Sequence, residues 1–214
     1  MQYDEGQAKL RSRARVATAM LWAFVAVAAI SGLGEVLKAS GTIDIAVDTS
    51  PLAMAIGLAY LAFSLVFLAC VIAVAMWIHR AHSNLRDAAV DGLEFTPGWA
   101  VGWYFIPFAN LVKPFQAMRE LWNASHGEAT TFGGEAPSEV KLWWGTWIAG
   151  NIVSNIGMRI VLMEDGGPGS VMAGNAIGAA GTALLMLAAV LLVRVIAGVT
   201  RAQRDGSTAV AVFA

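Results

Sequence analysis

Charged residues divide the chain into long uncharged runs separated by short polar segments. A mainly apolar helix of about 20 residues is long enough to cross the hydrocarbon core of a membrane. The pattern therefore predicts an all-α polytopic membrane protein, and the number of runs that cross decides its topology. The candidate runs are Val16–Gly34, Thr49–Ile78, Phe95–Val112, Leu142–Met158 and Gly166–Val193.

The middle run contains the sequence PGWAVGWYFIPFANLVKPF (residues 97–115), which is poorly suited to a transmembrane helix. Pro107 would remove a backbone hydrogen bond and clash with the preceding turn, and Gly98 and Gly102 weaken helix formation further. Irregular backbone at membrane depth persists only where protein or water covers it. We therefore expect a Pro- and Trp-rich loop that either lies on the membrane interface or re-enters the membrane between the spans.

The distribution of Lys and Arg favours four spans. If the 97–115 loop does not cross, eleven basic residues lie on one side, two lie on the other, and Arg194 lies inside the last span. Cytoplasmic loops carry an excess of Lys and Arg, so the loop and both termini are predicted to be cytoplasmic. The spans are expected at about residues 16–34, 52–78, 142–163 and 174–200.

These spans are predicted to form a single membrane domain, residues 16–205. A basic segment, residues 1–15, precedes it, and a tail, residues 206–214, follows it. The basic start resembles that of a signal peptide, but the 19 uncharged residues of the first run exceed the usual apolar region of about 7–15 residues. We expect a retained first span.

An aromatic-rich layer is predicted at the cytoplasmic boundary, because seven of the eight tryptophans lie at or near it and Trp prefers the membrane–water interface. Leu111, Phe115, Met118 and Trp122 recur on one helical face, which predicts a short amphipathic helix within a cytoplasmic-face element, residues 97–125. Exposed aromatic and basic side chains often anchor interfaces. The candidates for contact with a partner or with lipid are Trp99, Trp103, Phe105, Lys113, Arg119 and Trp122.

Composition agrees with a membrane protein and narrows the chemistry. Hydrophobic residues make up 57% of the chain and charged residues 14%, against about 25% charged in an average soluble domain. The net charge of −1 lacks the strong positive charge typical of nucleic-acid-binding proteins, so we expect no nucleic-acid partner. The single Cys70 and the pair His79 and His82 lack the companions of a metal or haem site, so we expect no cofactor.

Polar residues of the third span lie on one helical face. Asn151, Ser154, Asn155 and Arg159 follow the spacing i, i+3, i+4 and i+8. Polar groups are costly in hydrocarbon, so this face should meet other helices or a cavity. One interpretation is a polar path for a small solute; the other is hydrogen bonding between helices. We expect Glu35 to pair with Arg159, with snorkelling of Arg159 to the interface as the alternative.

Small residues recur one turn apart in the fourth span, at Gly174, Gly178 and Gly181. Such spacing lets two helices approach closely. We expect packing within the chain, and contact in a homo-oligomer as the alternative.

The end of the second span places Trp77, Arg80 and Asn84 on one face, at i, i+3 and i+7. These residues form either a polar dock for the loop that follows or an ordinary aromatic and basic anchor at the membrane interface.

Two segments carry a resemblance to a known family. The first joins MWIHRAHSNL, which holds the Trp77, Arg80 and Asn84 spacing, to TPGWAVGWYFIPFANLVKPFQAMRELW; the second is VIAGVTRAQ, near the C-terminus. Together they resemble the bacterial membrane family known as Domain of Unknown Function 4328. The resemblance implies a bacterial membrane protein, and it implies no established activity, cofactor or catalytic residue. Together with the predicted spans, it leads us to expect a multi-pass protein of the bacterial inner membrane.

Two functions follow as hypotheses. In the first, the protein is not an enzyme and binds a partner membrane protein or lipid through its cytoplasmic face. In the second, it is a small-molecule or ion transporter or channel lined by the third-span polar face. A homo-oligomer fits either hypothesis.

Overall fold

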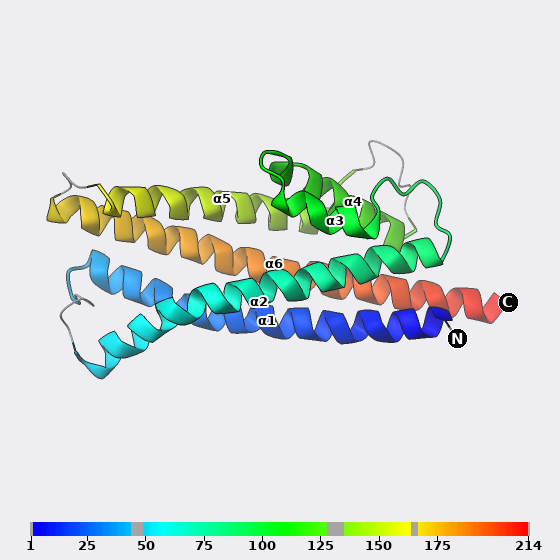
Figure 1. Ribbon diagram of the computed structural model, residues 1–214, viewed down its shortest axis with the longest axis horizontal. Helices are drawn as coiled ribbons and strands as arrows, with labels where there is room; N and C mark the ends of the chain where they lie inside the picture. Colours follow the sequence, from blue (N-terminus) through cyan, green and yellow to red (C-terminus); the bar gives the residue numbers. More distant parts are fainter. Residues whose placement is uncertain (1, 44–48, 128–134, 164–166, 214) are drawn as a thin grey trace. The chain divides into compact units, whose positions relative to one another are not determined.

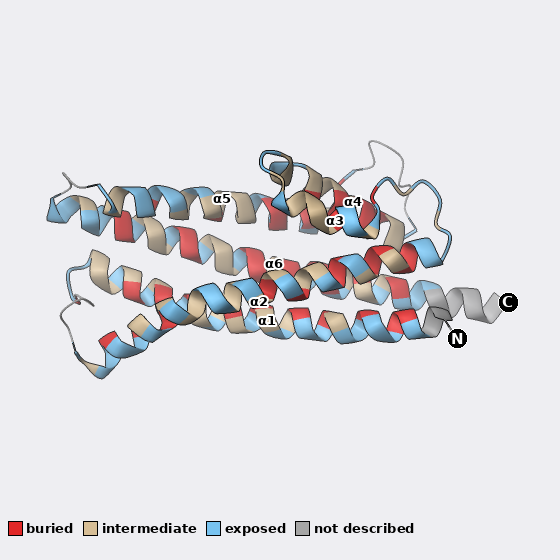
Figure 2. Cartoon of the chain, viewed as in Figure 1, coloured by how far each residue is buried: buried red, intermediate tan, exposed pale blue. Residues whose placement is uncertain are grey.

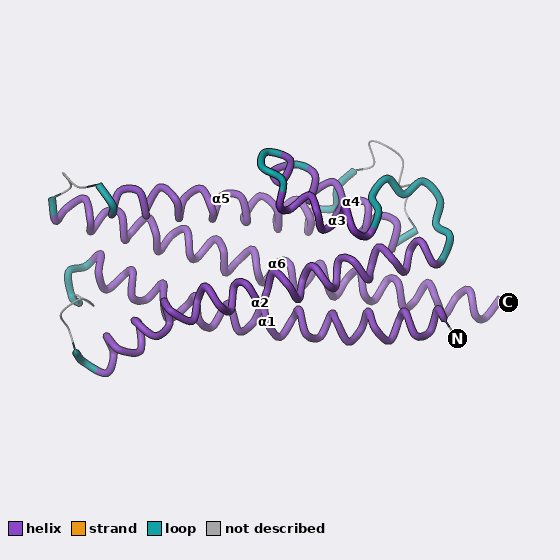
Figure 3. The backbone as a smooth tube through the Cα atoms, viewed as in Figure 1, coloured by secondary structure: helices purple, strands orange, loops and turns teal. Residues whose placement is uncertain are grey.

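The computed structural model describes residues 2–43, 49–127, 135–163 and 167–213, with side chains described between residues 5 and 206. All regular secondary structure in these ranges is helical (Figure 3), which confirms the all-α prediction. The four long helices are α1 (Gln2–Ala39), α2 (Pro51–Asp87), α5 (Ser138–Val161) and α6 (Pro168–Phe213). The short elements between α2 and α5 are α3 (Pro97–Gly102), η1 (Trp103–Phe105), η2 (Ala109–Leu111) and α4 (Lys113–Ser125) (Figure 1).

Three of the long helices are long and apolar enough to cross a membrane: Glu5–Ala39, Pro51–Asp87 and Pro168–Gly206. The helix α5 lies where the third span was expected, but it does not reach the same hydropathy, because three tryptophans and the polar residues Asn151, Ser154 and Asn155 interrupt its apolar sequence. Residues 97–115 hold three short helical elements, α3, η1 and η2, and the first turn of α4.

No helix begins or ends at the predicted limits of the membrane domain, residues 16 and 205. The helix α1 already begins at Gln2, and α6 continues to Phe213, so each expected flanking segment continues the helix of the adjacent span.

The chain divides into two compact units. The first unit contains residues 1–20, 70–142 and 191–214. Its core takes one face of each long helix it includes, together with α4 (Figure 2). The fully buried side chains there include Leu10, Trp77, Met118, Leu121 and Val195. The buried face of α4 differs from the predicted one, since of the expected stripe only Met118 is buried, beside Pro114, Ala117 and Leu121.

The second unit contains residues 21–69 and 143–190. A chain of aromatic contacts runs through it from the buried Phe24. Phe24 packs against Phe63 and Phe67, with ring centroids 5.3 and 6.2 Å apart, and Phe67 stacks on Trp147 at 6.1 Å. A second cluster joins Ile43, Ala53 and Ile56.

Candidate functional site

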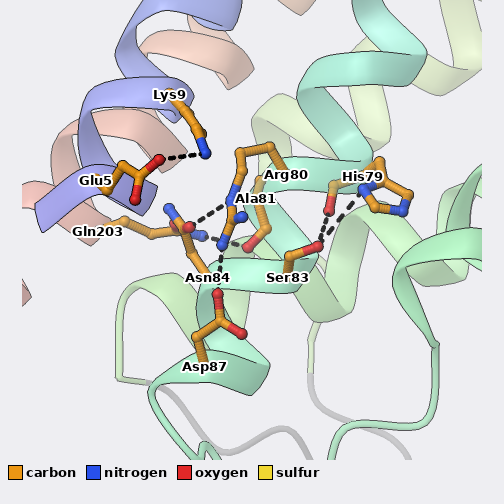
Figure 4. Close-up of polar contacts among 9 residues, drawn as sticks. All are labelled: Glu5, Lys9, His79, Arg80, Ala81, Ser83, Asn84, Asp87 and Gln203. Carbon is orange, nitrogen blue, oxygen red and sulfur yellow. Dashed lines mark hydrogen bonds and ion pairs between the residues drawn. The ribbon is translucent and has the colours of Figure 1, made fainter. Parts of the chain in front are cut away.

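A buried polar network joins α1, α2, α4 and α6 within the first unit. We define it by the side chains of Gln7, Trp77, Arg80, Asn84, Ser125, Thr200 and Gln203, and Figure 4 shows its centre at Arg80, Asn84 and Gln203. The indole N–H of Trp77 donates to the Thr200 hydroxyl over 3.2 Å, and Nδ2 of Asn84 donates to Oε1 of Gln203 over 3.2 Å. Because Trp77, Asn84 and Gln203 are buried, these hydrogen bonds act where an unpaired polar group would be costly.

Gln203 is the residue that connects most of the elements. Its Nε2 donates to the Ala81 carbonyl over 3.1 Å and to the Ser125 hydroxyl over 3.0 Å. Its own backbone carbonyl accepts a bond of 3.4 Å from Nε2 of Gln7. One glutamine on α6 therefore binds α1, α2 and the last residue of α4.

Arg80 completes the network at its exposed side. Its Nε donates to Oδ1 of Asn84 over 2.7 Å, and its guanidinium pairs with the Asp87 carboxylate (Figure 4). The Asn84 amide is thus held on both sides, by Arg80 and by Gln203. The spacing of Trp77, Arg80 and Asn84 does place three side chains on one face, but their partners lie on α2 and α6. They do not bind the carbonyls of the Pro-rich loop.

The loop that follows α2 is held by two other residues. The Glu120 carboxylate, on α4, accepts hydrogen bonds from the backbone N–H groups of Glu94 (2.6 Å) and Phe95 (3.1 Å). Arg86 donates to the Phe95 carbonyl over 3.1 Å. Burial raises the pKa of Glu120 above its ordinary value, and the nearby Glu94 carboxylate acts in the same direction, against the two N–H groups and Arg86.

Residues 97–125, which run from α3 through the two 3-10 turns to α4, form a short helical hairpin. We refer to this segment as the hairpin. Thr96 caps α3, since its hydroxyl accepts the Trp99 N–H over 3.3 Å, and Pro97 fits the first helical turn. The helices α3 and α4 pack together through the 3-10 turns between them (Figure 1).

The tip of the hairpin, residues 105–112, presents apolar side chains to the surroundings. Phe108 has a positive φ of 63°, which is uncommon for a bulky residue, and its side chain is 86% exposed. Phe105 is 69% exposed, and Leu111 and Val112 are also exposed. The turn therefore holds an aromatic ring outward at the cost of backbone strain.

The predicted contact residues fall into two groups. Trp99 and Phe105 are exposed, whereas Trp103, Lys113, Arg119 and Trp122 are half-buried. The Trp122 ring packs against α6 at Gly198, where an added Cβ would lie 2.7 Å from the ring, so Trp122 holds the hairpin in place. Lys113 lies over the rings of Phe95 and Trp103 and 3.8 Å from the Glu94 carboxylate.

The two asparagines on the polar face of α5 form their hydrogen bonds with carbonyl groups of the same helix. The amides of Asn151 and Asn155 donate to the carbonyls four residues earlier, both over 2.8 Å. Ser154 packs directly on Gly181, where a Cβ would lie 2.3 Å from its hydroxyl oxygen. Arg159 is exposed.

The Glu35 carboxylate accepts a hydrogen bond of 3.0 Å from Thr182. Within the described side chains, no ion pair joins it to Arg159. An uncharged hydroxyl on α6 thus takes the place expected for the arginine.

The glycines of α6 pack within the second unit. An added Cβ on Gly157 would lie 2.7 Å from the Gly174 carbonyl oxygen and from the Gly178 nitrogen, and one on Gly150 would lie 3.0 Å from Leu185. Together with Ser154 on Gly181, these contacts form a ladder of close approaches between α5 and α6.

The histidines do not meet. Nδ1 of His82 bonds to the Ile78 carbonyl oxygen, and His79 faces Ser83. Among the side chains that the structure describes, no group of three or more His, Cys, Asp or Glu could hold a metal ion.

Sequence reasoning missed Thr200, Gln203, Glu120 and Arg86. A signal for the first two was present, because both lie in the VIAGVTRAQ segment, one turn apart on the face that meets Trp77 and Asn84. No local pattern distinguishes Glu120 or Arg86 from a solvated charge.

No curated protein and no solved structure matches the chain. The family model described as Domain of unknown function (DUF4328) matches residues 41–201, a range that includes α2, the hairpin, α5 and most of α6. Because this match covers most of the chain, the protein belongs to the DUF4328 family.

Proposed function

We propose that the chain is a four-span membrane protein that acts without catalysis, by binding a partner protein or lipid through the hairpin at the cytoplasmic face. In this proposal α5 crosses the membrane as the third of the four spans, and the termini and the hairpin share the cytoplasmic side. The excess of Lys and Arg on that side supports the orientation.

The observation that carries the proposal is the exposed apolar tip of the hairpin. Contiguous exposed apolar surface on a folded protein commonly marks contact with another protein or with a membrane. Phe105, Phe108, Leu111 and Val112 are all more than half exposed. Trp99 is exposed too, and its ring packs on that of Trp103.

The hairpin is also held firmly enough to present this surface. Glu120 fixes the entry to α3, Ser125 joins the end of α4 to Gln203, and Trp122 packs on Gly198. A surface on a supported element loses less conformational entropy when it binds than a surface on a free loop.

The test is to purify the full chain in a mild detergent and to identify bound proteins and lipids by mass spectrometry. The variant Phe105→Ser/Phe108→Ser should lose the bound species. The matched control is Leu162→Ser/Met163→Ser, which changes two exposed apolar residues that lie just beyond the end of α5. A partner or lipid retained equally by both variants, or no bound species at all, would contradict the proposal.

Transport remains the second candidate function, carried by the polar face of α5. Asn155 and Arg159 are exposed on the single chain, so a polar path here would need a second copy of the chain or another protein to close it. Ion or solute flux into liposomes that is lost in Asn151→Ala and Asn155→Ala would favour this function.

A further inference from the structure

An open groove runs between α1 and α6 within the first unit, with a volume of about 770 Å³. Four arginines line it, two from each helix: Arg11, Arg15, Arg201 and Arg204. All four are exposed, and none of the described residues that line the groove is acidic. Arg204 bonds to Asp205 over 3.0 Å, at the surface.

The groove changes character along its length. In the first unit α1 and α6 run in opposite directions, so the N-terminal end of α1 lies beside the C-terminal end of α6 (Figure 1). At one end the lining contains Arg11 and Arg204; at the other it contains Ala19, Ile196 and Ala197. A cationic end thus passes into an apolar end over about 12 Å, the rise of the eight residues from Arg11 to Ala19 along α1.

The change from cationic to apolar lining follows the direction in which α1 and α6 would enter a membrane. Both belong to segments apolar enough to cross a membrane. The arginines of α1 immediately precede the uncharged run that starts at Val16. If α1 spans the membrane as proposed above, the cationic end lies at the level of the lipid phosphates and the apolar end lies toward the hydrocarbon.

We propose that this groove is a binding site for an anionic glycerophospholipid, whose phosphate is held by the four guanidinium groups and whose acyl chain follows Ala19, Ile196 and Ala197. Guanidinium groups bind phosphate oxygens in pairs, and basic pockets between membrane helices suit anionic headgroups. The apolar end favours a lipid over a free phosphate, because a free phosphate would leave that end unfilled. The proposal does not depend on the partner of the hairpin tip.

The groove adjoins the buried polar network. Thr200 lines the groove, and its hydroxyl accepts the hydrogen bond from Trp77. A bound lipid that fixes the distance between α1 and α6 should therefore also stabilise the network.

The test compares lipids that differ only in headgroup charge. The full chain in a nonionic detergent is titrated with palmitoyl-oleoyl phosphatidylglycerol, with the matching phosphatidylcholine, and with inorganic phosphate. Lipid bound per protein is read by native mass spectrometry, and the unfolding temperature is measured in parallel. We expect tighter binding and a larger rise in unfolding temperature with phosphatidylglycerol than with phosphatidylcholine.

Two matched variants locate the site. Arg11→Gln/Arg201→Gln removes two charges from the groove, and Lys9→Gln/Lys141→Gln removes two charges from exposed positions outside it. The first should weaken phosphatidylglycerol binding on the order of thirtyfold, and the second by less than about threefold. The variant Arg11→Lys/Arg201→Lys keeps the charge but loses the paired guanidinium contacts, so its binding should fall between that of the wild type and that of Arg11→Gln/Arg201→Gln.

Three results would overturn the proposal. Equal binding of the two lipids by the wild-type chain would show that headgroup charge is not recognised. Equal loss in the groove variant and its control would place the lipid elsewhere. Inorganic phosphate that stabilises the protein and displaces the lipid at comparable concentration would assign the arginines to a soluble phosphate ligand.

Discussion

The Asn84 amide donates a hydrogen bond of 3.2 Å to Oε1 of Gln203, and both side chains are buried although 119 positions separate them in the chain. Each residue has further partners, Arg80 for Asn84 and Ala81 and Ser125 for Gln203. The contact therefore links the end of α2, the end of α4 and α6 within one unit.

Replacing one member of this pair should be costly. Asn84→Leu would leave Oε1 of Gln203 and Nε of Arg80 without their partner, so we expect a loss of about 2–3 kcal/mol in the free energy of unfolding. Asn155→Leu is the control, because the Asn155 amide is exposed and binds only its own helix; it should change stability by less than about 0.5 kcal/mol. Reversible unfolding in mixed micelles measures both.

The double variant Asn84→Leu/Gln203→Leu should cost less than the sum of the two single changes, because removing both partners leaves fewer unpaired groups. Strictly additive losses would contradict a direct coupling between Asn84 and Gln203.

Gly198→Ala should release the hairpin from α6. The new methyl group would lie 2.7 Å from the Trp122 ring, so the ring must move, and we expect a loss of about 1–3 kcal/mol in stability. Gly206→Ala, on the same helix with open space around it, should be neutral or stabilising by up to about 1 kcal/mol. Thermal unfolding in detergent compares the two, and equal behaviour would argue against the Trp122 contact.

The ladder between α5 and α6 predicts a similar contrast in the second unit. Gly157→Ala and Gly181→Ala should each destabilise the chain by about 1–3 kcal/mol, because the added methyl groups would meet backbone atoms that cannot move aside. Gly145→Ala is the control, because Gly145 lies on α5 like Gly157 but faces open space. If the glycines instead served a homodimer, these variants would dissociate the dimer and leave the stability of the monomer unchanged.

Glu120 predicts a pH dependence. Its pKa is raised in the folded protein, so the fold holds this proton up to a higher pH than the unfolded chain, in which the pKa is about 4.3. The contribution to stability is complete below the unfolded pKa and is lost as the pH rises through the folded pKa. Wild type should therefore lose stability relative to Glu120→Gln as the pH rises from about 4 to 7. A difference that moves in favour of wild type would mean that the N–H groups of Glu94 and Phe95 outweigh burial.

Much of the fold follows from the distribution of charge and apolar residues. The uncharged runs locate all four long helices, and Pro107 with its neighbouring glycines excludes a long helix from the 97–115 loop. Helix ends were harder to predict, since Lys9, Arg11 and Arg13 are compatible with helix and give no signal that α1 begins well before the first span.

The site was less predictable, for a physical reason. The Trp77, Arg80 and Asn84 spacing shows which residues share a face, but the partner of that face lies on α6, and periodicity within one helix cannot identify it. Glu120 was missed because a carboxylate that binds two backbone N–H groups has the same local sequence as one in water. The prediction of an ion pair between Glu35 and Arg159 was wrong because the Glu35 carboxylate accepts a hydrogen bond from Thr182, on a third helix. Spacing within the first and third spans could not reveal this hydroxyl.

The central claim, four spans with the hairpin on the same side as both termini, is tested most directly by labelling single cysteines in intact cells. In a Cys70→Ala background, Gly98→Cys, Glu139→Cys and Gly206→Cys should react with a membrane-impermeant maleimide only after the cells are permeabilised. Gly169→Cys should react in intact cells, because α5 must cross between Glu139 and Gly169. All of these positions are exposed in the structure or face open space. Labelling of Glu139→Cys and Gly169→Cys from the same side would show that α5 does not cross, and would contradict the account.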